Sequence, residues 1–229
     1  MGDSFATPTG QSKWPQMLNL AGGLALAALL GGCRTTSLVD LEQTIPGLVL
    51  DIRYATTNNF TGQQLYPAAR CFLHRTPAKK LRAVQTDLAR QGLGLKIFDG
   101  YRPLSVQRQM WAVFPQPGYV ADPKKGSRHN RGAAVDVTLI RLADGTELVM
   151  PTPYDDFTES AHRNFMDLHG EAIRNRQLLE QVMTRHGFVG LPTEWWHFDD
   201  RDWKNYPLLD VDIPGAASPR TPRSPGDPP

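Results

Sequence analysis

The sequence is poor in cysteine, with only Cys33 and Cys71 among its 229 residues. Two cysteines cannot build the disulfide framework that stabilises many small secreted domains. A chain of this length does not need such a framework, because it can bury a sizeable apolar core. Cys71 is followed by Phe72 and Leu73, so we expect it to be a buried structural thiol.

Basic residues are neither in large excess nor clustered. The chain has 25 Lys and Arg against 23 Asp and Glu, a formal net charge of +2. Its short basic pairs, such as Lys79-Lys80 and Lys124-Lys125, are isolated from one another. A surface that binds nucleic acid needs Lys and Arg gathered on one face. We therefore expect no nucleic-acid partner.

The chain also lacks an apolar run that would span a bilayer comfortably. The longest run, residues 17–32, falls short of the roughly 18–20 residues that a membrane helix needs. Lys13 precedes this run and small residues lead up to Cys33, which is the layout of a secretory signal peptide. An ordinary cleaved signal and an uncut signal anchor are both compatible with it, as is a shorter leader that starts at Met17.

The end of this run, Leu30-Gly31-Gly32-Cys33, resembles the bacterial lipobox, whose cysteine is lipidated and becomes the mature N-terminus. The resemblance implies a lipoprotein-type signal peptide over residues 1–32. It also implies an exported protein of the periplasm or cell envelope, anchored to a membrane through Cys33. Residues 33–45 are then a tether, residues 46–213 the folded domain, and residues 214–229 a disordered tail rich in Pro, Gly and Ser.

Hydrophobic periodicity predicts helices and short strands in the folded domain. Strands and helices alternate without regular βαβ spacing, which favours an α+β fold with a small mixed or antiparallel sheet flanked by helices. The expected helices are 77–91, 104–113 and 171–186, and the expected strands are 48–55, 93–98, 133–140 and 194–198.

An acidic residue stands at the centre of the most apolar predicted strand. Asp136 lies between Val135 and Val137, and a buried carboxylate is costly unless it is paired or binds a metal. His129, seven residues earlier, would face the opposite side of an unbroken strand. The two side chains converge only if His129 lies in the loop before the strand and Gly132 turns the chain.

A second histidine and a second carboxylate follow in Glu194-Trp-Trp-His197. Two histidines and one carboxylate are the minimum protein set for a catalytic zinc that keeps one position open for water. A further carboxylate, which is not a ligand, is needed to accept the proton of that water. For Glu194 to act beside His197, it must lie at the entrance of the predicted strand.

The segment Asp99-Gly-Tyr-Arg102-Pro103 marks the end of a strand and the start of a turn. An arginine fixed between Gly100 and Pro103 is well placed to project into a cleft. There it would stabilise the oxyanion that develops when water attacks a peptide carbonyl.

These motifs together resemble the D-alanyl-D-alanine dipeptidase family of zinc peptidases. The resemblance rests on Ser127-x-His129-x-x-Gly132-x-x-x-Asp136 and Glu194-Trp-Trp-His197, and it extends to the segments that begin at Tyr54, Asp99 and Pro153. It implies one zinc per chain, held by His129, Asp136 and His197. It also implies Glu194 as general base and Arg102 as the oxyanion ligand, with a small substrate pocket lined by Tyr54, Ser127 and Asp155.

The expected reaction is hydrolysis of D-Ala-D-Ala to two D-alanines, in the turnover of cell-wall peptides. The first alternative is a D,D-carboxypeptidase or other murein peptidase that acts on longer stem peptides. The second is a zinc-stabilised binding module without catalysis. Asp155 and the paired tryptophans before His197 favour the dipeptidase, and the presence of both Glu194 and Arg102 argues against a non-catalytic module.

Overall fold

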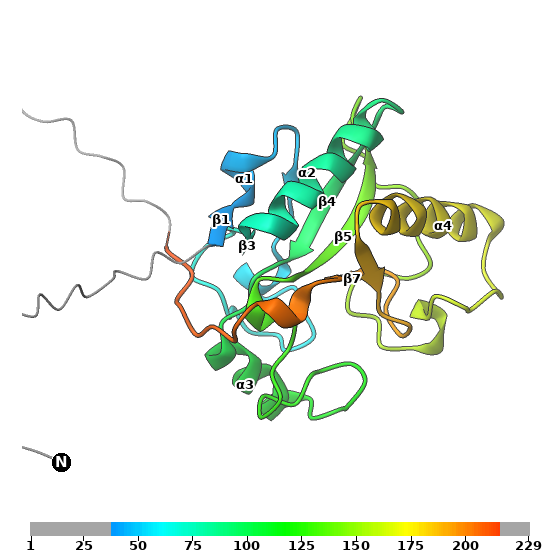
Figure 1. The fold of residues 1–229 in the computed structure, drawn as a ribbon. Coiled ribbons are helices and arrows are strands. Elements are labelled where there is room, and N and C mark those ends of the chain that lie inside the picture. Colours follow the sequence, from blue (N-terminus) through cyan, green and yellow to red (C-terminus); the bar gives the residue numbers. More distant parts are fainter. Residues whose placement is uncertain (1–37, 216–229) are drawn as a thin grey trace, which may run out of the picture. The chain divides into compact units, whose positions relative to one another are not determined.

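The computed structural model describes residues 38–215 (Figure 1). Four 3₁₀ turns, η1 (Arg53–Ala55), η2 (His129–Arg131), η3 (Glu159–Ala161) and η4 (Trp203–Asn205), accompany the helices and strands. In chain order, those are β1 (Leu38–Asp40), α1 (Leu41–Thr44), β2 (Val49–Leu50), β3 (Phe72–His74), α2 (Arg75–Ala89), β4 (Leu93–Asp99), α3 (Leu104–Val113), β5 (Ala134–Arg141), α4 (Gly170–Arg185), β6 (Phe188–Gly190) and β7 (His197–Asp200).

The main sheet has five strands in the order β2-β4-β5-β7-β6. β2 runs parallel to β4, whereas the other neighbouring strands are antiparallel. β1 and β3 form a separate antiparallel pair. This arrangement confirms the predicted α+β class with a mixed sheet.

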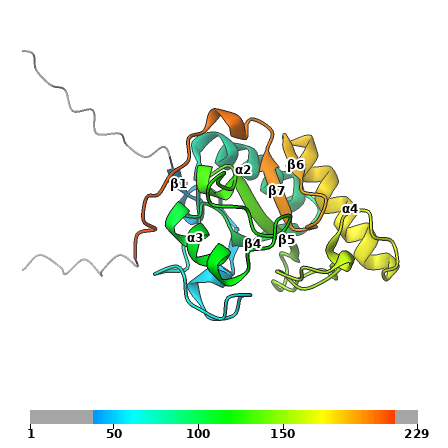
Figure 2. The same ribbon diagram turned by 90° about the horizontal axis from the view of Figure 1, so that it is seen from below.

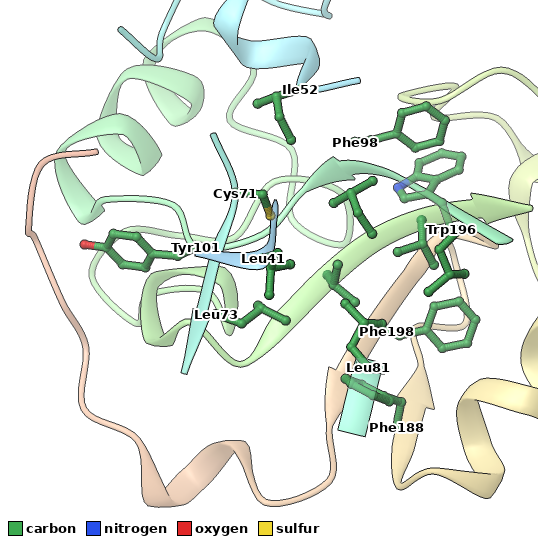
Figure 3. Packing of buried hydrophobic residues seen from close by; sticks show 14 of the residues in the cluster. Leu41, Ile52, Cys71, Leu73, Leu81, Phe98, Tyr101, Phe188, Trp196 and Phe198 are labelled. Atoms are coloured by element: carbon green, nitrogen blue, oxygen red, sulfur yellow. The ribbon is translucent and has the colours of Figure 1, made fainter. Parts of the chain in front are cut away.

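The two faces of the central strand β5 carry different chemistry. Val135 lies opposite Phe198 of β7, and residues opposite one another share a face of the sheet. Val135, Phe198 and Leu81 of α2 belong to one buried apolar cluster, part of which Figure 3 shows, so this face packs against the helix. Side chains alternate along a strand, so Asp136 points to the other face, away from α2.

The predicted helices agree with the structure within two residues, because their apolar positions recur at helical spacing. In α2, Leu81, Val84 and Leu88 are fully buried. The chain leaves β4 at Asp99 and turns through residues 100–103 into α3, which begins and ends where the sequence predicted (Figure 2).

Two predicted strands are wrong in extent. In place of a strand over 48–55, only Val49–Leu50 pairs, and η1 follows. The tight turn buries Tyr54 against Phe60 and Tyr66, and these edge-on aromatic contacts outweigh the strand propensity of the segment. The last predicted strand, 194–198, instead covers His197–Asp200, so that Glu194 precedes it.

The predicted tether reaches too far into the chain. Residues 38–44 already form β1 and α1, because Leu41 and the C-capping residue Ile45 are buried in the core. The predicted signal peptide and the lipidation site Cys33 lie outside the described residues, as does the tail beyond residue 215. Among residues 38–215, no helix is long and apolar enough to cross a membrane. Cys71 is buried, as expected.

Candidate active site

The sheet itself brings three polar side chains together. Asp136 on β5 lies opposite Asp99 on β4 and opposite His197 on β7. The register between β4 and β5 shifts after Ile97, and this bulge places Asp99 rather than Phe98 beside Asp136. The three side chains therefore occupy the sheet face that α2 does not cover.

His129 reaches the same place from η2, the turn that precedes β5. Gly132 ends this turn with φ of 59°, in the left-handed region that favours glycine. A Cβ on Gly132 would also come within 3.1 Å of the backbone nitrogen of His74. The structure thus has the turn that the sequence required for His129 and Asp136 to converge.

Three potential ligand atoms meet at this point. His129 Nε2 lies 3.1 Å from His197 Nδ1, which lies 3.0 Å from Asp136 Oδ1. The third side of the triangle, from His129 Nε2 to Asp136 Oδ1, is 3.4 Å. Zinc bonds of 2.0–2.2 Å in a tetrahedron separate ligand atoms by roughly 3.3–3.6 Å. The triangle is close to the size that a zinc ion requires.

The hydrogen bonds of the two imidazoles leave lone pairs facing into this triangle. His129 Nδ1 lies 2.7 Å from the carbonyl oxygen of Gly100, which can only accept, so the proton is on Nδ1. His197 Nε2 donates in the same way to Asp199 Oδ1 at 2.9 Å. In their neutral forms, His129 Nε2 and His197 Nδ1 are therefore unprotonated beside a carboxylate oxygen, an arrangement that a cation would stabilise.

The electrostatics around His197 also favour a positive charge. Burial by itself would lower the pKa of His197, but the carboxylates of Asp199 and Asp136 raise it to about 10. The other oxygen of Asp136, Oδ2, accepts a hydrogen bond from the Tyr154 hydroxyl at 2.9 Å. Neighbouring side chains thus fix the orientation of both oxygens of the buried Asp136 carboxylate.

Glu194 lies in the loop before β7 and lines the same cavity as the three ligand candidates. It is buried and does not belong to the metal-binding group. Burial raises the pKa of the Glu194 carboxyl to about 8, even though nearby His197 acts to lower it. A carboxyl group with such a pKa can both accept and release a proton near neutral pH.

Arg102 is held rigidly at the wall of the cavity. Its Nε and Nη2 donate to Asp99 Oδ2 at 3.1 and 2.7 Å, and its Nη1 donates to Gln107 Oε1 at 2.9 Å. The guanidinium also lies 5.2 Å from the ring centroid of Tyr54. Asp99 is itself fixed, because its Oδ1 accepts from the Tyr66 hydroxyl at 2.8 Å. This buried network fixes the orientation of Arg102.

Among the predicted substrate-binding residues, Asp155 has the most unusual backbone conformation. Its φ is 61°, which lies in the left-handed region. Non-glycine residues adopt this conformation at some energetic cost, and residues that do so cluster at functional sites. The Tyr54 hydroxyl lies 3.2 and 3.1 Å from its two carboxylate oxygens. Burial, reinforced by Asp136, raises the pKa of Asp155 to about 8.

Ser127 lies at the base of η2. Its hydroxyl accepts from the backbone nitrogen of His129 at 3.2 Å, and its own backbone nitrogen donates to Asn130 Oδ1 at 2.6 Å. The side chain of Asn130 in turn donates to the carbonyl of Arg102 at 2.9 Å. These bonds tie the turn that carries His129 to the segment that carries Arg102.

All eight predicted site residues line one cavity of about 200 Å³. Apolar and aromatic side chains, among them Phe60, Tyr119 and Phe157, complete its wall. A cavity that combines a potential metal triangle, a buried carboxyl group and a fixed guanidinium has the components needed to hydrolyse a small amide.

The sequence analysis missed three residues that support this site. Tyr154 orients Asp136, Asp199 orients His197, and Arg163 holds the loop that carries Glu194. Arg163 Nε donates to the Leu191 carbonyl at 2.9 Å, and Nη2 donates to the carbonyls of Trp195 and His197 at 3.0 and 2.7 Å. Asp199 could have been predicted from the sequence. Residues two apart on a strand point to the same face, and His197 is two residues earlier.

Comparison with known proteins places the chain among peptidases. Residues 34–213 match the family described as D-ala-D-ala dipeptidase. A D-alanyl-D-alanine dipeptidase of Escherichia coli is 41% identical over 175 residues, which cover 76% of this chain and 90% of that protein. Proteins of the same name from Enterococcus faecium and Enterococcus faecalis are 32% and 31% identical, over 76% and 69% of this chain and 96% and 88% of their own lengths.

Proposed function

Because the chain belongs to the D-alanyl-D-alanine dipeptidase family, we propose that it hydrolyses the free dipeptide D-Ala-D-Ala to two D-alanines. The observation that carries this proposal is the cavity of about 200 Å³, which gathers the potential metal triangle, Glu194 and Arg102. A site for larger organic ligands typically measures ~300–1,000 Å³, so the small cavity favours a short substrate.

The metal part of the site fits one zinc ion per chain. His129, Asp136 and His197 would hold it, and their nitrogen-rich donor set suits zinc better than magnesium or calcium, which prefer oxygen ligands. When bound, zinc supplies a Lewis acid that lowers the pKa of water and polarises the scissile carbonyl.

Glu194 is the proton carrier in the proposed mechanism. Its carboxylate takes a proton from the attacking water and later delivers it to the nitrogen of the leaving D-alanine. One residue can do both because its pKa of about 8 lies near neutral pH. The positive charge of a bound cation would lower this pKa and increase the carboxylate fraction that starts the reaction.

Arg102 stabilises the oxyanion that forms at the attacked carbonyl. Asp99 and Gln107 already hold its guanidinium, so little reorganisation is needed when the charge develops. Preorganised donors of this kind stabilise developing charge strongly where they are shielded from water, and Arg102 is buried. Any reorientation of Arg102 would have to break the buried ion pair with Asp99.

Asp155 pairs with the free ammonium group of the dipeptide, with Tyr54 orienting its carboxylate. The ammonium favours the ionised form of Asp155, whose pKa burial otherwise raises. Ser127 lines the pocket on the His129 side. A free ammonium distinguishes a dipeptide from the end of a longer peptide, so this pairing would select short substrates.

A single assay separates this proposal from its alternatives. The purified, zinc-loaded full chain would be incubated with D-Ala-D-Ala, with a pentapeptide that ends in D-Ala-D-Ala, and with L-Ala-L-Ala as a stereochemical control. We expect D-alanine release chiefly from the free D,D-dipeptide. Faster release from the pentapeptide would favour a D,D-carboxypeptidase, and no release from any substrate would favour a non-catalytic zinc module.

We also propose that the protein is exported and anchored to a membrane by a lipid on Cys33, where it would act on dipeptide from the cell wall. The support is the apolar segment 17–32 and the lipobox-like sequence that ends in Cys33. Membrane fractionation and mass spectrometry of the N-terminus test this proposal. We expect wild-type protein in the membrane fraction and Cys33→Ser protein outside it or unprocessed. Soluble wild-type protein with unmodified Cys33 would contradict the anchor.

A further inference from the structure

A series of contacting side chains connects Trp203, beyond the last strand of the sheet, to His197 through Arg128 and Asp199. Asp199 Oδ1 accepts the hydrogen bond of His197 Nε2 at 2.9 Å, while Asp199 Oδ2 lies 3.5 Å from Arg128 Nε. The Arg128 guanidinium carbon lies 4.7 Å from the centroid of the Trp203 ring. Trp203 belongs to η4, three residues beyond the end of β7.

This series connects the two segments that carry histidines. Arg128 immediately precedes His129, and Asp199 follows His197 on β7. The ion pair between Arg128 and Asp199 therefore bridges the η2 turn to the last strand of the site. Arg131 and Lys204 also lie within cation–π distance of Trp203, at 5.4 and 5.7 Å, so this ring is a common platform for basic side chains.

We propose that Arg128 and Asp199 are a positioning pair that fixes the proton and the ring orientation of His197, with Trp203 supporting Arg128. This inference rests on the proposed zinc site. Asp199 keeps the proton on Nε2 and leaves Nδ1 as the ligand atom, and its negative charge makes the imidazole a stronger donor. Arg128 offsets the cost of burying the Asp199 carboxylate and holds its second oxygen away from His197.

Arg128 also lines the catalytic cavity, so a direct contact with the substrate carboxylate is the competing role. The two roles predict different measurements. A positioning residue changes metal affinity in the absence of substrate, whereas a substrate contact raises KM and leaves metal affinity unchanged. The ion pair to Asp199 and the contact with Trp203 favour positioning, because both connect the Arg128 guanidinium to the segment that follows the metal ligand candidate His197.

The test measures zinc affinity by chelator competition and records the visible spectrum of the cobalt-substituted protein, which reports the ligand geometry. Asp199→Ala is expected to weaken zinc binding by about 10- to 100-fold and to alter the cobalt spectrum. Asp199→Asn should lose less, because the amide oxygen can still accept from His197 Nε2. Arg128→Ala should weaken zinc binding several-fold, and much less when Asp199 is already alanine.

Matched controls lie close by in the chain. Asp202→Ala removes a nearby acidic group that pairs with Lys80 instead of His197, and Lys204→Ala removes a cation that contacts Trp203 but not Asp199. Neither should change zinc affinity. Trp203→Phe should behave like wild type, whereas Trp203→Ala should show a weaker form of the Arg128→Ala effect. Thermal unfolding of each protein identifies any general loss of stability.

Two results would overturn the positioning pair. The first is wild-type zinc affinity and an unchanged cobalt spectrum in both Asp199 variants. The second is an Arg128→Ala protein whose KM rises while its zinc affinity is unaltered, which would make Arg128 a substrate ligand. The two metal measurements use no substrate. Failure of the dipeptidase proposal would be seen separately, as a lack of D-alanine release in the activity assay.

Discussion

The metal-binding half and the substrate-binding half of the site are held in place by different kinds of structure. Two of the three residues of the metal half lie on the sheet, where Asp136 and His197 are neighbours in register, and His129 joins them from the η2 turn. The substrate half stands on loops, and Asp155 and Glu194 are held by a few side-chain and backbone contacts. Strand pairing is shared over many residues, whereas each loop depends on a few individual contacts. The comparison implies that metal retention and turnover can be impaired separately, by changes in different halves.

The largest expected effect comes from removing a ligand in the metal half. His129→Ala and His197→Ala should each abolish stoichiometric zinc binding and with it activity, because two remaining protein ligands make a poor zinc site. Elemental analysis should give about one zinc per wild-type chain, with activity lost on chelation and restored by zinc. His162→Ala, outside the metal group, is the control and should keep its zinc. Full activity of the metal-free wild type would contradict the zinc assignment.

The next largest effect comes from removing the proton-transfer group, Glu194, which belongs to the loops. Glu194→Ala should keep its zinc but lower kcat by about 10²–10⁴-fold, the usual contribution of a placed proton-transfer group. The isosteric Glu194→Gln should behave alike, because it also cannot accept the proton. Zinc content and kcat are measured on the same preparation. Loss of zinc in step with loss of activity would mean that Glu194 is a ligand.

In the substrate half, Asp155→Asn should lower kcat/KM for D-Ala-D-Ala by about 10- to 100-fold. A charge-assisted hydrogen bond contributes roughly 1.5–3 kcal/mol, and each ~1.4 kcal/mol is a factor of ten. N-acetylation of the dipeptide should cause a comparable loss in the wild type.

The decisive control combines the two changes. If Asp155 pairs with the ammonium, the N-acetyl dipeptide should lose little further in the Asp155→Asn protein, because the partner is already gone. Equal rates of wild type on the acetylated and free dipeptides would mean that the pocket does not recognise the amine. The D,D-carboxypeptidase alternative would then be preferred.

The same division explains what could be predicted from the sequence. The alternation of Val135, Asp136 and Val137 identified a polar residue in a buried strand and required His129 to lie in the preceding turn, as the structure has it. Strand and helix periods encode such relations directly. The sequence did not indicate how the loops are held, because their contacts join residues far apart in the chain.

Arg163 illustrates this limit. Its guanidinium holds the loop through backbone carbonyls, which every residue possesses, so the sequence does not show which residues of the loop it binds. The strand predicted over 48–55 failed for a similar reason. Tyr54 is drawn into an aromatic cluster with Phe60 and Tyr66, and these tertiary contacts override the local preference of the segment.

The smallest expected effect tests the loop support directly. Gly190 of β6 packs against the Arg163 guanidinium so closely that a Cβ at position 190 would overlap it. Gly190→Ala should therefore displace Arg163 from the carbonyls of Leu191, Trp195 and His197, and shift Glu194, which lies between Leu191 and Trp195 in the chain. Misplacing a reacting group by 1 Å can cost ~10²-fold, so a shift of a fraction of that distance should lower kcat by roughly 5- to 10-fold.

Zinc content should be retained in Gly190→Ala, because strand pairing with β5 still holds His197. Arg163→Lys, which keeps the charge but loses the planar fork, should reproduce the loss, and the double variant should add little to either single one. Val189→Ala, at an exposed neighbouring position of β6, is the matched control and should keep wild-type kcat. If Gly190→Ala lost zinc as readily as activity, the two halves of the site would be coupled through β6, and their proposed independence would be wrong.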